Sequence, residues 1–75
     1  MRLISQGGRT DINYKKCVLK TTDYTIEALY DGGKHFLAEY SSPQKVDKVM
    51  NRLHDKYKLC SGKGIFYFPK DSEVV

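Results

Sequence analysis

One amphipathic helix is the feature of this sequence that most constrains its fold. In the segment from Ser42 to Lys58, five apolar side chains recur at the spacing that places them on one helical face: Val46, Val49, Met50, Leu53 and Tyr57. Ser42 suits the N-cap, and Pro43 then occupies the first helical position, where its missing N–H leaves no hydrogen bond unmade. The sequence therefore predicts a helix over about residues 43–58 whose apolar side must be covered by other elements.

The length of the chain limits what can cover that helix. At 75 residues, the sequence predicts a single small domain over residues 1–75, near the lower size at which a core is stable without disulfides or metal. A hydrophobic fraction of 40% and a charged fraction of 29% are typical of globular domains and exclude a disordered chain. We expect residues 70–75, which are mostly polar, to form a frayed tail.

Five segments carry strand-type residues between turn signals: 2–6, 12–20, 24–30, 34–40 and 65–68. The tripeptide Asp31-Gly32-Gly33 tolerates positive φ and predicts a hairpin. Neither face of segment 12–20 alternates cleanly, which favours a bulge there. The order is ββββαβ, and its short connections favour antiparallel neighbours. The sequence thus predicts an α+β fold, with a small antiparallel sheet of four to five strands and the helix packed on one face.

The expected core joins the helix face to one side of these strands. It comprises the following residues: Ile4, Val18, Ile26, Ala28, Phe36, Ala38, Val46, Val49, Met50, Leu53, Tyr57, Phe66 and Phe68. Gly62 is expected to help end the helix. Gly62-Lys63-Gly64 is therefore not read as a phosphate loop, which would have to lead into a helix rather than follow one.

Three stretches carry a resemblance to a known group of proteins. The opening MRLISQGGRTDINY, the pairing of FLAEYSS with a helix reading KVMNRL, and the late strand IFYFP resemble uncharacterised small proteins of Gram-positive bacteria and their phages. The likeness covers most of the chain, and its motifs are structural. It implies an origin in a bacterium or phage, and nothing about chemistry.

A basic strip beside the apolar face is the one candidate binding site on the helix. Four side chains form it: Lys45, Lys48, Arg52 and Lys56. Like charges at i, i+4 are mildly destabilising, so the strip is a candidate for binding phosphates or the carboxylates of an acidic partner. Long basic side chains at the edge of an apolar face also simply extend their charges into water. A solvated face, a protein partner and a nucleic acid are all left open.

A second candidate surface is aromatic. If the outer face of the sheet presents several tyrosines among lysines, it could stack bases as single-strand binders do. The residues concerned are Tyr14, Tyr24, Tyr30, Tyr40 and Tyr67, with Lys15, Lys16 and Lys20. Tyrosine is equally a normal resident of half-buried sheets.

The sequence predicts no enzymatic activity, no cofactor and no metal site. His35 and His54 have no partner in the sequence that suggests a catalytic pair. Cys17 and Cys60 show no CxxC or CxxH spacing and are expected to be small apolar fillers.

The predicted function is a non-enzymatic protein-interaction module, because a small core with open strand edges favours self-association or docking on a partner. Self-association would use an edge strand or the exposed sheet face. The alternative is a weak electrostatic nucleic-acid-binding protein that uses the basic strip, consistent with a net charge of +4. No small-molecule substrate is indicated. The segment MRLISQGG has no apolar run of signal-peptide length and no run suits a membrane span, so we expect a cytoplasmic protein.

Overall fold

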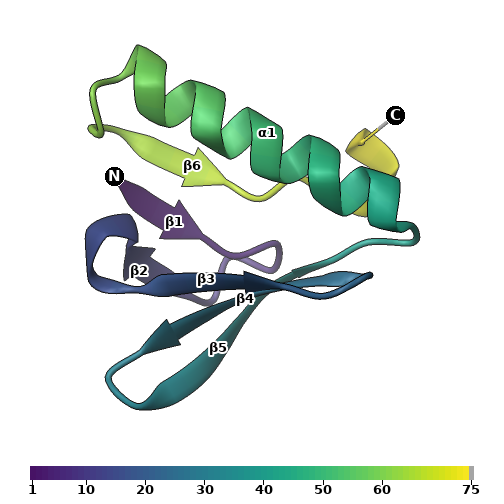
Figure 1. Ribbon diagram of the computed structural model, residues 1–75, viewed down its shortest axis with the longest axis horizontal. Coiled ribbons are helices and arrows are strands. Elements are labelled where there is room, and N and C mark those ends of the chain that lie inside the picture. Colours follow the sequence, from purple (N-terminus) through teal and green to yellow (C-terminus); the bar gives the residue numbers. More distant parts are fainter. Residues whose placement is uncertain (75) are drawn as a thin grey trace.

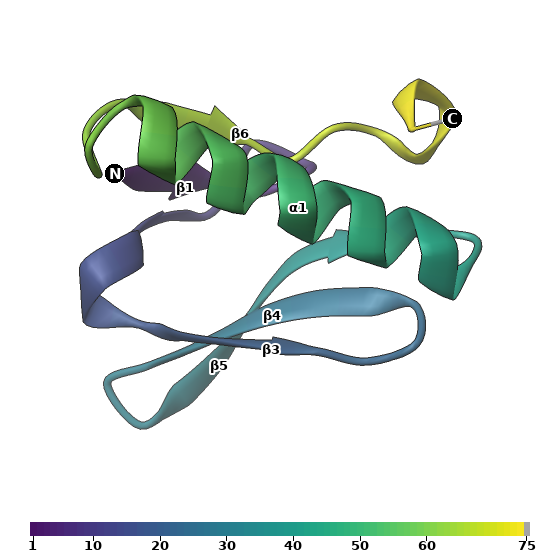
Figure 2. The same ribbon diagram turned by 45° about the horizontal axis from the view of Figure 1, so that its top comes forward.

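The computed structural model describes residues 1–74, and it has an α+β fold with one helix and two small sheets (Figure 1). The elements follow in the order β1 (Arg2–Ile4), β2 (Asp11–Asn13), η1 (Tyr14–Lys16), β3 (Val18–Thr21), β4 (Thr25–Tyr30), β5 (Gly33–Glu39), α1 (Pro43–Leu59), β6 (Ile65–Tyr67) and η2 (Asp71–Glu73), where η1 and η2 are single 3-10 turns. Both views place α1 beside β1 and β6, with the β4–β5 hairpin projecting from the other side of the molecule (Figures 1 and 2).

Helix α1 begins at Pro43 as predicted and ends at Leu59, one residue beyond the predicted end. The Ser42 hydroxyl oxygen accepts a hydrogen bond from the Lys45 N–H at 3.3 Å, and Pro43 is the first helical residue. At the other end, the Gly62 N–H donates to the Tyr57 carbonyl oxygen at 2.9 Å with Gly62 at φ +77°. That left-handed conformation suits glycine and completes the C-terminal cap.

The prediction of a single sheet of four to five strands in the order ββββαβ is wrong. The described residues form two three-stranded sheets, with strand orders β2–β1–β6 and β3–β4–β5. The segment expected as one strand over 12–20 is two strands, because the Asn13 side chain accepts from the Lys15 N–H at 2.9 Å and starts the turn η1. The chain turns there and enters the second sheet, so the irregular alternation of this segment reflects a 3-10 turn and not a bulge.

The prediction of an all-antiparallel sheet is also wrong for β6. Strand β6 runs parallel to β1, with Leu3 opposite Phe66. After α1 the chain returns to the end of the molecule where it began, and the Met1 amino group donates to the Gly62 carbonyl oxygen at 2.6 Å. Because β6 starts beside the start of β1, the two strands run in the same direction.

A β-bulge in β5 decides which of its side chains are buried. Ile26 lies opposite Ala38 and Glu27 opposite Phe36, so Leu37 is an extra residue in β5. Leu37 and Ala38 are consequently both buried in succession, whereas Phe36 is 51% exposed. The prediction that Phe36 belongs to the core is therefore wrong, since strict alternation fails at this bulge.

The core is one cluster shared by α1 and both sheets. Eight of the expected core residues are buried: Ile26, Ala28, Ala38, Val46, Val49, Leu53, Phe66 and Phe68. Ile4, Met50 and Tyr57 are half-buried, and Val18 is 66% exposed and outside the core. The core also takes in five residues outside the expected set: Leu3, Ile12, Leu37, Tyr40 and Val74.

The end of the described chain differs from the frayed tail that the sequence predicts. Asp71–Glu73 forms the turn η2, and the following Val74 is 2% exposed. The Tyr40 hydroxyl donates to the Pro69 carbonyl oxygen at 2.7 Å, and the Gln6 amide donates to the same oxygen at 3.1 Å. These contacts hold the segment against the domain; Val75 lies outside the described residues.

The bulge predicts that Leu37 contributes more to stability than Phe36, the reverse of what strict alternation would predict. Leu37→Ala removes a fully buried side chain and should lower the free energy of unfolding by about 2–5 kcal/mol. Phe36→Ala removes a half-exposed ring and should cost less than about 1 kcal/mol. Urea denaturation at low protein concentration measures both values. A larger loss for Phe36→Ala than for Leu37→Ala would contradict the bulge.

Candidate functional site

The side of the β3–β4–β5 sheet that carries Val18, Leu29 and Phe36 is the main candidate surface, and we call it the outer face. Val18 lies directly opposite Leu29 in the strand register. Phe36, two residues on from the partner of Leu29, lies on the diagonal from Leu29 across the same face. These side chains are 66%, 37% and 51% exposed, respectively. Together they form an apolar row across all three strands.

The outer face is exposed because of how the sheet packs. Alternate residues of β4, Ile26 and Ala28, point into the core that contains Val49 and Leu53 of α1. The intervening residues of β4 therefore face away from the helix. No element of residues 1–74 covers that side, as the projecting β4–β5 hairpin in Figure 2 illustrates.

The charges on the outer face balance one another. Lys20 lies opposite Glu27, and Lys34 lies opposite Leu29. Glu39 lies opposite Thr25 at the far end of the same face. Two lysines and two glutamates therefore surround the apolar row, and they make no ion pair with one another within residues 1–74. The face is close to neutral in a chain whose net charge is +4.

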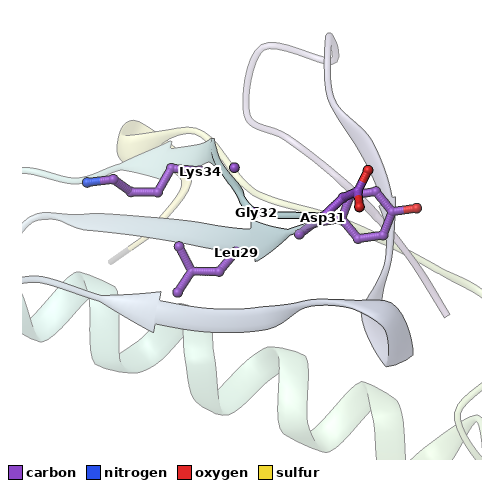
Figure 3. A pocket seen from close by; sticks show the side chains of 6 residues that line it. Leu29, Asp31, Gly32 and Lys34 are labelled. Carbon is purple, nitrogen blue, oxygen red and sulfur yellow. The ribbon is translucent and has the colours of Figure 1, made fainter.

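The β4–β5 turn adds a shallow hollow to one end of this face. Asp31 and Gly32 both have positive φ, +51° and +77°, as a tight hairpin turn of the predicted kind requires. The hollow has a volume of about 420 Å³ and is lined by residues 29–34. Figure 3 shows Leu29 and Lys34 extending from neighbouring strands, with the Lys34 side chain running back along β5 away from Gly32. An open hollow with one carboxylate and one ammonium group does not enclose a small molecule.

A second hollow, of about 470 Å³, lies where the chain end meets β5. The Asp71 carboxylate accepts the Ser41 N–H at 2.7 Å and lies 3.3 Å from the Lys45 ammonium group. The Ser41 N–H is the main cause that lowers the pKa of Asp71 below its ordinary value, and Lys45 contributes. Burial raises the pKa of Tyr40, in the same hollow, to about 12. The polar groups here hold the chain end in place.

The basic strip predicted on α1 is divided in the structure. Lys45 is half-buried, and its ammonium group donates to the Asp71 carbonyl oxygen at 3.0 Å in addition to the ion pair. Lys56 is also half-buried, whereas Lys48 and Arg52 are exposed. Lys45 is thus committed to the segment that ends in η2, and the binding role of the strip stays a prediction.

The tyrosines do not gather on one surface. Tyr40 is buried, and Tyr14 packs against Tyr57 with ring centroids 4.9 Å apart. Tyr24 and Tyr30 are exposed near opposite ends of β4, while the exposed Tyr67 belongs to the other sheet. The arrangement lacks the row of exposed rings that a base-stacking surface needs.

The histidines and cysteines lie apart from one another. His35 is half-buried opposite Ala28, and its ring centroid is 6.1 Å from that of Tyr30, whereas His54 is exposed on α1. Cys17 and Cys60 are free and half-buried, and burial raises the pKa of the Cys17 thiol. Within residues 1–74 no group of three or more His, Cys, Asp or Glu side chains is placed to hold a metal ion.

No family model, no curated protein and no solved structure matches this chain. The resemblance to small proteins of Gram-positive bacteria and their phages therefore stays a prediction. None of the helices formed by residues 1–74 has the length and apolar character to cross a membrane.

Sequence reasoning missed the outer face because it placed Val18 and Phe36 in the core. The signal for Phe36 was the adjacent pair Leu37-Ala38, two apolar residues in succession, which a regular strand cannot bury on one side. For Val18 the signal was the irregular alternation of segment 12–20, whose cause was the turn η1.

The Asp71 contacts generate a prediction about acid stability. Folding lowers the pKa of Asp71 from its ordinary 3.8. The ionised carboxylate therefore adds to the free energy of unfolding above pH 3.8, and this stabilisation is lost as the pH falls through the folded-state pKa. Asp71→Asn should therefore flatten the decline in the free energy of unfolding between about pH 5 and pH 2.5. Urea denaturation followed by circular dichroism across this range measures it.

Asp23→Asn is the matched control for this experiment. The Asp23 carboxylate is exposed and makes no hydrogen bond or ion pair with the other described residues. This variant removes the same charge and should keep the pH dependence of the unmodified protein. Equal flattening by the two substitutions would contradict the role of Asp71.

Proposed function

We propose that this protein is a non-enzymatic interaction module that self-associates, with the outer face of the β3–β4–β5 sheet as its contact surface. The apolar row of Val18, Leu29 and Phe36 is the observation that carries the proposal. Apolar side chains gathered on one face of a small domain are typical of a binding surface, whereas scattered ones are not. Burying the row would remove apolar area from water in a protein whose core is small.

The charge pattern favours a second copy of this chain as the partner. A twofold contact places the same surface on both sides, so a face with a large net charge would repel itself. Here two lysines and two glutamates balance: Lys20, Lys34, Glu27 and Glu39. A twofold axis through the apolar row can set the lysines of one copy against the glutamates of the other.

The sheet edges are less suited to this contact than the face. The Gln6 side chain covers the free edge of β5, since its amide donates to the Glu39 carbonyl oxygen at 3.1 Å and accepts the Glu39 N–H at 3.0 Å. The Gln6 N–H also donates to the Leu37 carbonyl oxygen at 2.8 Å. The other edge strand, β3, has only four residues and includes Lys20. Short, charged and covered edges discourage strand pairing.

The size of the face indicates a weak complex. Three strands about 4.8 Å apart, with about six residues at 3.3 Å each, give a footprint of roughly 300 Å². A standard stable interface buries about 800 Å² on each partner. We therefore expect a dimer with a dissociation constant in roughly the micromolar to millimolar range, so that association depends on protein concentration.

Phe36→Lys tests the contact. It places a cation in the apolar row opposite Glu27, a cross-strand pair that the monomer tolerates. Sedimentation equilibrium between about 10 and 500 μM should show the average mass of the unmodified protein rising with concentration, because dimers are populated by mass action. The Phe36→Lys variant should keep the mass of a monomer throughout.

Leu59→Lys is the control with the same change in charge. Leu59 is 85% exposed at the end of α1 and does not belong to the outer face. This variant should associate like the unmodified protein. A monomeric unmodified protein at every concentration, or equal loss of association in both variants, would overturn the proposal.

A further inference from the structure

Five lysines gather at one end of the molecule, which we call the basic end. They come from two separate stretches of the chain, residues 14–17 and 56–64, which contain no Asp or Glu: Lys15, Lys16, Lys56, Lys58 and Lys63. Only Lys56 belongs to the strip predicted on the helix. Lys56 is half-buried and the other four are exposed. The basic end is therefore a different surface from the strip, and sequence spacing alone did not indicate it.

Tertiary contacts bring these stretches together. The rings of Tyr14 and Tyr57 pack with their centroids 4.9 Å apart, which sets η1 against the last turns of α1. The Tyr14 N–H donates to the Met1 carbonyl oxygen at 2.9 Å, and the Met1 amino group donates to the Gly62 carbonyl oxygen. Both views show the turn between β2 and β3, the start of the chain and the α1–β6 connection at the same end (Figures 1 and 2).

The five lysines of the basic end weigh heavily in the charge of the chain. Thirteen Lys and Arg residues stand against nine Asp and Glu residues in the whole sequence. Without the five lysines of the basic end, eight basic residues remain for the nine acidic ones. The five lysines of the basic end are thus enough to account for the net positive charge of +4. None of these five lysines forms an ion pair with a carboxylate of residues 1–74.

We propose that the basic end binds the phosphate backbone of nucleic acid without preference for base sequence. Lysine ammonium groups on flexible stems bind phosphates as point charges. Duplex DNA offers one phosphate for about every 1.7 Å of its axis, so lysines spread over one end of a domain can each meet a phosphate. The two lysine stretches contain no arginine, the residue that most often reads guanine through paired hydrogen bonds, and Arg2 beside them is paired with Asp11.

Stabilisation of the dipole of α1 explains only some of the five lysines of the basic end. Cations in the last turn of a helix are favourable because they offset its dipole, and this explains Lys56 and Lys58. Lys15, Lys16 and Lys63 lie outside α1. They add like charge to the same end of the molecule, and phosphates would relieve the resulting repulsion.

The test measures the salt dependence of binding. A fluorescently labelled 20-base-pair duplex of mixed sequence is titrated with the full chain at about 50 and 200 mM NaCl, with fluorescence anisotropy as the readout. The variant is the double substitution Lys15→Gln and Lys63→Gln, which leaves the helix untouched. The control is Arg9→Gln with Lys70→Gln, which removes the same charge from two exposed residues outside the basic end. Circular dichroism and urea denaturation establish that both variants are folded.

Five phosphate contacts predict that the affinity of the unmodified protein falls about 500-fold between the two salt concentrations, and three contacts predict a fall of about 40-fold. The Lys15→Gln/Lys63→Gln variant should therefore bind more weakly at low salt and show a log–log slope smaller by nearly two. The control should keep the slope of the unmodified protein.

Three results would overturn the proposal. The first is no binding of the duplex by the unmodified protein at low salt, a result that needs no variant. The second is an equal loss of affinity in the variant and in the control, which would indicate a response to net charge alone. The third is tight binding of polyglutamate with no binding of the duplex, which would assign the basic end to an acidic protein. Phe36→Lys leaves the five lysines intact, so failure of self-association and failure of DNA binding are distinguishable.

Discussion

Burial of one helix face is the constraint on which the rest of this structure depends. Val46, Val49 and Leu53 of α1 are at most 2% exposed, and they contact a core to which both sheets contribute. Strands of three to seven residues in three-stranded sheets are marginal without a packed face, and an isolated helix of 17 residues is marginal in water. The helix and the two sheets therefore stabilise one another, and none of them is expected to persist alone.

The same constraint explains why a sheet face is left uncovered. The inner side of the β3–β4–β5 sheet packs into the core that α1 and the other sheet share, and the remaining described residues form β1, β2, β6 and the segment that ends in η2. No second layer forms among residues 1–74, so the outward-facing residues of β3, β4 and β5 are uncovered there. The bulge at Leu37 adds Phe36 to that side when it turns Leu37 inward. The apolar row thus arises from the uncovered side of this sheet together with one irregularity in one strand.

Local signals predicted the parts of the fold that local chemistry determines. Ser42 and Pro43 set the start of α1, Gly62 ends it, and Asp31-Gly32 forms the expected hairpin turn. In each case the deciding group lies within a few residues of the element that it shapes. The α+β class followed from these elements, because each had a recognisable beginning and end.

The division into two sheets could not be predicted in the same way. It depends on the Asn13 side chain, which favours a 3-10 turn over a continuous strand, and on the return of the chain to Met1, which makes β6 parallel to β1. The docking of the chain end likewise depends on Tyr40 and Gln6 reaching Pro69 across the fold. Contacts between residues far apart in sequence leave no periodic signal. The gathering of lysines at the basic end could not be predicted either, because it depends on contacts between residues far apart in sequence.

The two candidate surfaces differ in their electrostatics, and this difference argues that they have separate roles. The outer face is nearly neutral and apolar at its centre, as contact with an identical surface requires. The basic end gathers five lysines, whose like charge would oppose such a contact between two copies of that end. The folded state tolerates this concentration of positive charge partly because the C-terminus of α1 carries a partial negative charge beside Lys56 and Lys58. A dimer formed through the outer faces would leave both basic ends accessible, so one polyanion could engage two of them and gain affinity through avidity.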